Sequence, residues 1–146
     1  MRRYEIYLME EEVARHYFGQ ESKLFHLFLE KERASDTTRS IIEKQVNYIT
    51  RPIPALQLQQ LLKQSLKHRI DYYSYKDTHC LSLQPSLSIA EVNLFETKIT
   101  LEAEGNFDAE TIFFEVLRKF DPYFMAIDVK NFRYGWLNPI KQVKLI

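Results

Sequence analysis

The stretch "FETKITLEAEGNFDAETIFFEVLRKF", residues 95–120, contains two different periodicities that together indicate the fold class. Its first ten residues alternate between apolar and polar positions, with Phe95 and Thr97 on the apolar side, which is typical of a strand with one buried face. From Asp108 to Phe120 the apolar residues recur at helical spacing, and Asp108 stands where an N-cap is expected. A strand followed by a helix with its own apolar stripe predicts helices packed against a sheet.

The segments around this stretch extend the predicted sheet. "SLSIAEVNL", residues 86–94, is expected to pair with the following strand as a hairpin, with a bulge near Ile89 and Ala90 where the alternation slips by one. "YFMAIDV", residues 123–129, is nearly all apolar, as expected of an interior strand. Alternation in residues 4–8 predicts a further short strand close to the N-terminus.

Four helices are expected between that first strand and residue 70. The first follows the acidic run at 10–12 and ends at Gly19, because glycine readily takes the left-handed conformation that closes a helix. The second spans residues 21–33, the third ends before Pro52, and the fourth begins near Pro54. The predicted fold class is α+β: a small, partly antiparallel sheet with packed helices, in the order strand, four helices, strands, helix, strand, as a single domain over 1–146.

Composition limits the possible partners of the chain. Its 20 basic and 20 acidic residues cancel, so the domain has no general electrostatic attraction for nucleic acid or anionic lipid. Cys80 is the single cysteine, which excludes an internal disulfide and favours a reducing compartment. No long apolar run follows the N-terminal arginines, so we expect no signal peptide, no membrane span and a cytoplasmic location.

No residue pattern in the sequence predicts catalysis. The three glycines are far apart and form no phosphate-binding loop. His79 and Cys80 are neighbours on a predicted strand, so their side chains point to opposite faces and cannot act as base and nucleophile. The four histidines do not have the spacing of metal ligands; they are His16, His26, His68 and His79. We therefore expect no enzyme activity, no cofactor and no metal.

Two other segments have alternative interpretations. The densest basic run, at residues 63–69, is either a phosphate-binding patch or the solvated face of a helix. In "RYGWLNPI", residues 133–140, Gly135 is expected to form a tight turn that folds Trp136 and Leu137 onto the core.

Four blocks of the sequence together resemble the SirA family, the sporulation inhibitors of replication. They occur in family order at both ends and in one central block, and none of them is a widespread motif. The blocks are "YEIYLMEEEVARHYFGQESKLFHLF" from residue 4, "EKQVNYITRPIP" at 43–54, "AETIFFEVLRKF" at 109–120 and "RYGWLNPI" at 133–140.

The resemblance implies a function that composition does not indicate. SirA proteins bind the N-terminal domain of the replication initiator DnaA and block new rounds of initiation at the onset of sporulation, without enzyme activity or cofactor. The alternative is a nucleic-acid-binding regulatory protein that acts through residues 63–69.

The resemblance also implies which residues contact the partner. Carried over by position, the family's contact surface maps to Val13, Tyr17 and Gln45. Relatives can carry phenylalanine at the position of Val13, and valine has less apolar area than phenylalanine. Ile41 and Tyr48 lie beside Gln45 at helical spacing and complete the candidate partner-binding set.

The first helix has two interpretations. Its apolar residues, Val13, Ala14, Tyr17 and Phe18, span an arc of roughly 140°, and this pattern alone favours a single stripe buried in the core. The resemblance reverses that interpretation for Tyr17, leaves Val13 open between core and interface, and leaves Phe18 in the core.

Overall fold

The computed structural model describes residues 1–85 and 87–138. Within these ranges the helices are α1 (Glu11–His16), α2 (Glu21–Arg33), α3 (Asp36–Ile49), α4 (Ala55–Leu66) and α5 (Asp108–Phe120). The strands are β1 (Arg2–Met9), β2 (Thr50–Arg51), β3 (Tyr72–Tyr75), β4 (Thr78–Leu83), β5 (Ser88–Leu94), β6 (Ile99–Gly105), β7 (Phe124–Asp128) and β8 (Arg133–Trp136). The α+β class is confirmed, and α2 has the bounds that the sequence predicts.

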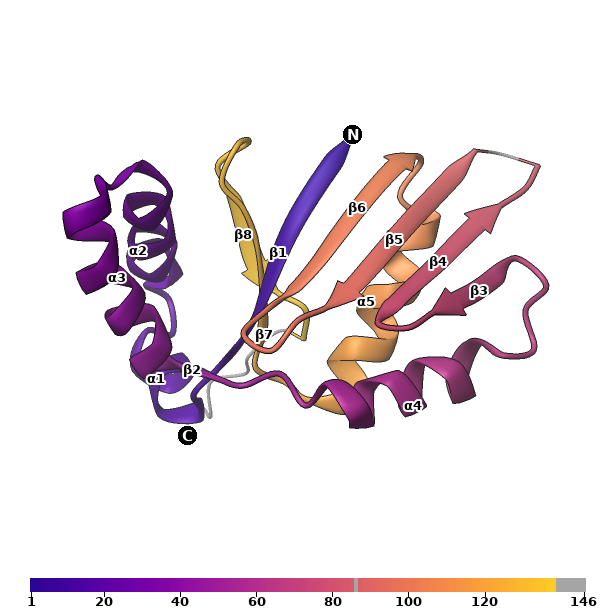
Figure 1. Ribbon diagram of the computed structural model, residues 1–146, viewed down its shortest axis with the longest axis horizontal. Coiled ribbons are helices and arrows are strands. Elements are labelled where there is room, and N and C mark those ends of the chain that lie inside the picture. Colours follow the sequence, from indigo (N-terminus) through magenta and orange to yellow (C-terminus); the bar gives the residue numbers. More distant parts are fainter. Residues whose placement is uncertain (86, 139–146) are drawn as a thin grey trace, which may run out of the picture.

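The strands form one sheet in the order β3-β4-β5-β6-β1-β7-β8, with the short β2 pairing to the end of β1. Every pairing among the described strands is antiparallel. The N-terminal strand therefore lies inside the sheet, between β6 and β7, and its Ile6 pairs with Ile99 on one side and Ala126 on the other. The sheet with its flanking helices is shown in Figure 1.

Two separate cores lie on the two faces of the sheet. The α4/α5 core packs α4 and α5 against the strands from β4 to β7, and Leu58, Leu62, Phe113 and Leu117 are fully buried in it. Burying one such side chain contributes roughly 1.5–3 kcal/mol, so this larger cluster dominates the stability of the fold.

The α2/α3 core covers the opposite face over β1 and β7, and Trp136 of β8 packs against it. There α2 and α3 pack on Tyr7, Met125 and Ile127, and the ring of Tyr7 lies 4.5 Å from that of Phe28. Ile6 to Met9 are consequently all buried, because the second half of β1 has a core on each side. In Figure 1, α1–α3 stand at one end of the sheet, whereas α4 runs beneath the other end.

The hairpin of β5 and β6 differs from the sequence prediction in two ways. Its register is continuous from Ser88–Gly105 to Leu94–Ile99, so the bulge predicted near Ile89 is wrong. The second strand begins at Ile99, because the amide of Phe95 donates to the Lys98 carbonyl (3.0 Å) and closes the connecting turn. Phe95 and Thr97 are therefore exposed, contrary to the prediction.

Two local predictions made for residues near α5 and β8 are also wrong. Asp108 is the first residue of α5, not its cap, and its amide donates to the side chain of Asn106 (2.9 Å). Gly135 lies inside β8, paired with Ala126, and makes no tight turn. Alternation in a four-residue edge strand is too short a signal to separate strand from turn.

Candidate protein-binding surface

The structure places α1 directly beside the C-terminal end of α3. β2 follows α3 and pairs with the end of β1, so that Met9 lies opposite Thr50. The amide of Glu10, just before α1, donates to the carbonyl of Ile49, the last residue of α3 (2.9 Å). Two elements that are far apart in the sequence therefore meet at one end of the molecule (Figure 1).

On α1, the two predicted contact residues are half-buried. Val13 and Tyr17 pack against the α2/α3 core and keep part of their surface in solvent. The helix is shorter than predicted: it ends at His16, and Tyr17 is its C-cap, with its amide donating to the Val13 carbonyl (3.0 Å). The ring of Tyr17 lies edge-on to that of His16, at 4.9 Å between centroids.

Phe18 does not belong to the core. Its side chain is 37% exposed, which corrects the prediction that it completes a buried stripe. The helix has already ended before this residue, so the turn from Tyr17 to Gly19 carries it off the apolar face that a continuous helix would have given it.

The helix α3 has three sides that differ in burial and polarity. Ile42 and Val46 are buried in the α2/α3 core. A second side carries Ile41, Gln45 and Tyr48, which we call the α3 stripe; all three are exposed, Ile41 by 60% and Tyr48 by 85%. The third side is polar and exposed, with Ser40, Glu43, Lys44 and Asn47.

The α3 stripe has the chemistry of a protein-binding surface. Isoleucine and tyrosine are large apolar side chains that gain free energy when a partner removes them from water. Tyrosine combines a rigid ring with a hydroxyl group, and it is enriched among residues that dominate binding energy. The sequence predicted this half-exposed stripe, and the structure places its C-terminal end next to α1.

His79 and Cys80 are built into the fold in a way that does not suit catalysis. The fully buried His79 accepts a hydrogen bond from the Tyr72 hydroxyl at Nδ1 (2.8 Å) and donates from Nε2 to Gln59. Burial lowers its pKa from 6.5 to about 4, with a smaller contribution from Lys63, so the ring is neutral near pH 7. Burial also raises the pKa of the Cys80 thiol, which disfavours the thiolate.

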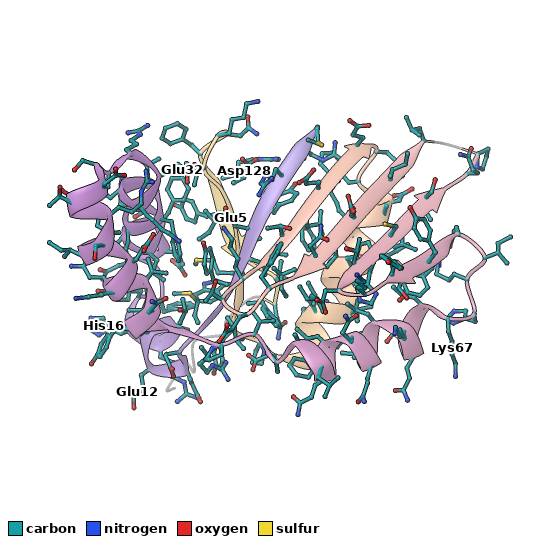
Figure 2. The ribbon with its side chains drawn as sticks, in the orientation of Figure 1. Glu5, Glu12, His16, Glu32, Lys67 and Asp128 are labelled. Atoms are coloured by element: carbon teal, nitrogen blue, oxygen red, sulfur yellow. The ribbon has the colours of Figure 1, made fainter. Side chains whose placement is uncertain are left out.

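A hollow of about 330 Å³ between α2, β1 and β7 is lined by three carboxylates, those of Glu5, Glu32 and Asp128 (Figure 2). Two of these carboxylates already have partners. Glu5 accepts from Lys98 (3.0 Å) and from the Tyr7 hydroxyl (2.9 Å), and Asp128 accepts from Arg133 and Asn131. Burial tends to raise the pKa of Glu5 and Asp128, but these hydrogen bonds outweigh it and lower both pKa values.

Across residues 1–85 and 87–138, no group of three or more His, Cys, Asp or Glu side chains is arranged to hold a metal ion. Over the same residues, no helix has the length and apolar character needed to cross a membrane.

The basic run lies away from the candidate surface. His16 on α1 and Lys67 after α4 stand at opposite ends of the molecule (Figure 2). Lys63 and Lys67 are exposed, but Arg69 forms a two-pronged ion pair with Asp71 at 2.9 and 3.1 Å, which removes one cation from the run.

Comparison with known proteins identifies the family. Residues 2–141 match the family described as sporulation inhibitor of replication protein SirA. The chain is also 44% identical over 148 aligned positions to the Bacillus subtilis (strain 168) protein of that name, and the alignment covers 97% of this chain and 96% of the relative. On both grounds, the chain belongs to the SirA family.

Proposed function

We propose that this chain inhibits the initiation of DNA replication at sporulation by binding the N-terminal domain of the initiator DnaA in the cytoplasm. The relative from Bacillus subtilis is named for inhibition of replication in sporulation, and it aligns with this chain over nearly the whole of both proteins. The inhibitor acts by occupying a surface of its partner, without catalysis, cofactor or metal.

The binding surface of the proposal consists of Val13 and Tyr17 from α1 and Ile41, Gln45 and Tyr48 from α3. The observation that carries it is the exposure of the α3 stripe on a helix whose C-terminal end meets the start of α1, together with the half-buried Tyr17 that follows α1. Isolated exposed apolar residues are common on proteins, but here an isoleucine and a tyrosine share one side of a helix whose other exposed side is polar.

Calorimetry with the N-terminal domain of the cognate initiator tests this proposal. Replacing Tyr17 by Ala is expected to weaken binding by about 2 kcal/mol or more, roughly 30-fold in Kd, because the ring anchors the interface. The double variant Tyr17→Ala, Gln45→Ala should weaken it further.

The matched control is the double variant Glu43→Ala, Asn47→Ala on the polar side of α3, which should bind like the unmodified chain. Unchanged affinity of the Tyr17→Ala variant, with an unchanged circular dichroism spectrum, would reject Tyr17 as an anchor. No binding by the unmodified chain would reject the partner itself.

A further inference from the structure

A groove of about 400 Å³ lies between α2 and α3, and the surface that lines it is mainly apolar. Leu29 and Ile42 form its floor and are almost fully buried, and Ala34 closes the end at the connection between the two helices. The exposed residues His26, Glu30, Arg33 and Thr38 stand at its rim, so the rim is polar and charged around an apolar floor.

The groove opens onto the α3 stripe. Thr38 lies three residues before Ile41, which is followed at helical spacing by Gln45 and Tyr48, so all four side chains share one side of α3. Thr38 is both a wall of the groove and the next member of that row. From Thr38 to Tyr48 the row is about 15 Å long at 1.5 Å per residue.

We infer that the groove receives the apolar side chains of an amphipathic helix of the initiator's N-terminal domain, an inference that rests on the proposed function. Two helices joined by a two-residue connection run antiparallel, and the furrow between them suits the ridge of a third helix. An apolar helix face laid in a groove is a recurrent mode of recognition, and side chains one turn apart would fit between the rows of α2 and α3.

The continuity of the two surfaces selects this occupant. A partner that covers Gln45 and Ile41 comes within one helical turn of Thr38, so the same domain reaches the mouth of the groove. The interface would then extend from α1 along α3 to the C-terminal end of α2. The apolar floor, with Leu29 and Ile42, would provide the dry pocket in which anchor residues contribute most.

A bulky residue at the rim tests the inference. The Thr38→Trp variant fills the mouth of the groove from an exposed position and is expected to weaken binding of the initiator's N-terminal domain at least tenfold in calorimetry. Its control, Ser40→Trp, adds the same side chain two residues along α3 on the exposed polar side and should leave the affinity unchanged. Circular dichroism of both variants checks that α3 is intact.

A second measurement uses the unmodified chain. Titration with the initiator domain should shift the methyl resonances of Leu29 and Ile42, whereas those of Leu62, buried in the α4/α5 core on the other face of the sheet, should stay in place. Unmoved Leu29 and Ile42 methyl groups, or unweakened binding by the Thr38→Trp variant, would overturn the inference.

The outcomes separate this inference from the proposed function. If Tyr17→Ala weakens binding and Thr38→Trp does not, the proposed function stands and the groove is not part of the interface. If the unmodified chain does not bind the domain, both fail. If the chain alone forms a dimer that Thr38→Trp dissociates, the groove binds a second copy and the inference is wrong.

Discussion

At the scale of single residues, two glycines with the same backbone conformation differ in their surroundings. Gly19 and Gly105 both have positive φ, 80° and 82°. A Cβ atom at Gly19 would meet nothing within 4 Å, whereas at Gly105 it would lie 2.2 Å from the backbone oxygen of Leu87. At Gly19, glycine is needed only because the backbone has a positive φ. At Gly105 it is also needed because the backbone of Leu87 approaches too closely for a side chain to fit.

Alanine substitutions should separate these two requirements. We expect Gly19→Ala to lower the free energy of unfolding by about 1 kcal/mol, the cost of a left-handed alanine. Gly105→Ala should lower it by about 3 kcal/mol, because the backbone at Leu87, just before β5, must also move. Urea unfolding of both variants measures the difference, and equal losses would contradict the close approach at Gly105.

His79 should make stability depend on pH. Its pKa is about 4 in the folded protein and 6.5 in the unfolded chain, so the unfolded state binds the proton more readily. Stability is therefore full above pH 6.5 and decreases as the pH falls from 6.5 to 4, by up to about 3 kcal/mol at 1.36 kcal/mol per unit. A proton on Nδ1 would also remove the acceptor for the Tyr72 hydroxyl.

The groups around His79 are Lys63, whose charge lowers its pKa further, and Asp77, which opposes that effect. Unfolding free energies at several pH values should show a shallower decline for the His79→Gln variant than for the unmodified chain. Parallel curves would mean that His79 contributes nothing to the acid sensitivity. The comparison is needed because Glu5 and Asp128, whose pKa values are lowered, also lose their stabilising effect in acid.

At the scale of elements, a buried ion pair joins the first strand to the last described helix. Arg2 in β1 donates from Nε to the Glu110 carboxylate in the first turn of α5 (2.8 Å) and from Nη1 to the Gly105 carbonyl (2.9 Å). Glu110 is 1% exposed, so without Arg2 its charge would be buried without a cation. The neighbouring pair of Arg3 and Glu102 (3.0 Å) is exposed to solvent.

These adjacent arginines provide a matched test. Arg2→Ala is expected to cost about 3 kcal/mol of stability, because a buried charge loses its partner. Arg3→Ala should cost less than about 1 kcal/mol, since an exposed pair is well screened by solvent. Thermal or urea unfolding distinguishes the two variants. Similar small losses of unfolding free energy would show that groups other than Arg2 stabilise the Glu110 carboxylate.

At the scale of the whole molecule, the basic run and the proposed surface lie at opposite ends, so salt should distinguish their roles (Figure 2). Binding of the initiator domain through an apolar-centred interface should change by less than about tenfold between 50 and 200 mM salt. Nucleic-acid binding through the three Lys and Arg side chains of this run would lose up to roughly 40-fold in affinity over that range, at a slope of about −0.9 per phosphate contact.

The double variant Lys63→Glu, Lys67→Glu completes this test. It should bind the initiator domain with unchanged affinity, because both lysines lie outside the proposed surface. Nucleic-acid binding by the unmodified chain that weakens with added salt and is lost in this variant would favour the nucleic-acid alternative instead.

The sequence by itself determined the types of most elements and the candidate residues. Period-two and helical patterns record which side chains face a core, so they predicted β1, α2, α4 and α5 from local information. The same logic separated Ile41, Gln45 and Tyr48 from the buried side of α3. Family resemblance, not periodicity, selected Tyr17 on α1.

Only the tertiary structure decided the features that depend on distant partners. The strand order and the central place of β1 follow from contacts between segments far apart in the chain. The exposure of Phe18 follows from where α1 ends, and the groove follows from how α2 and α3 pack against each other. A local pattern indicates that a side chain is buried, but it does not indicate which other element covers it. The reason is physical: strand pairing and helix packing gain their free energy between elements, so no single segment contains that information.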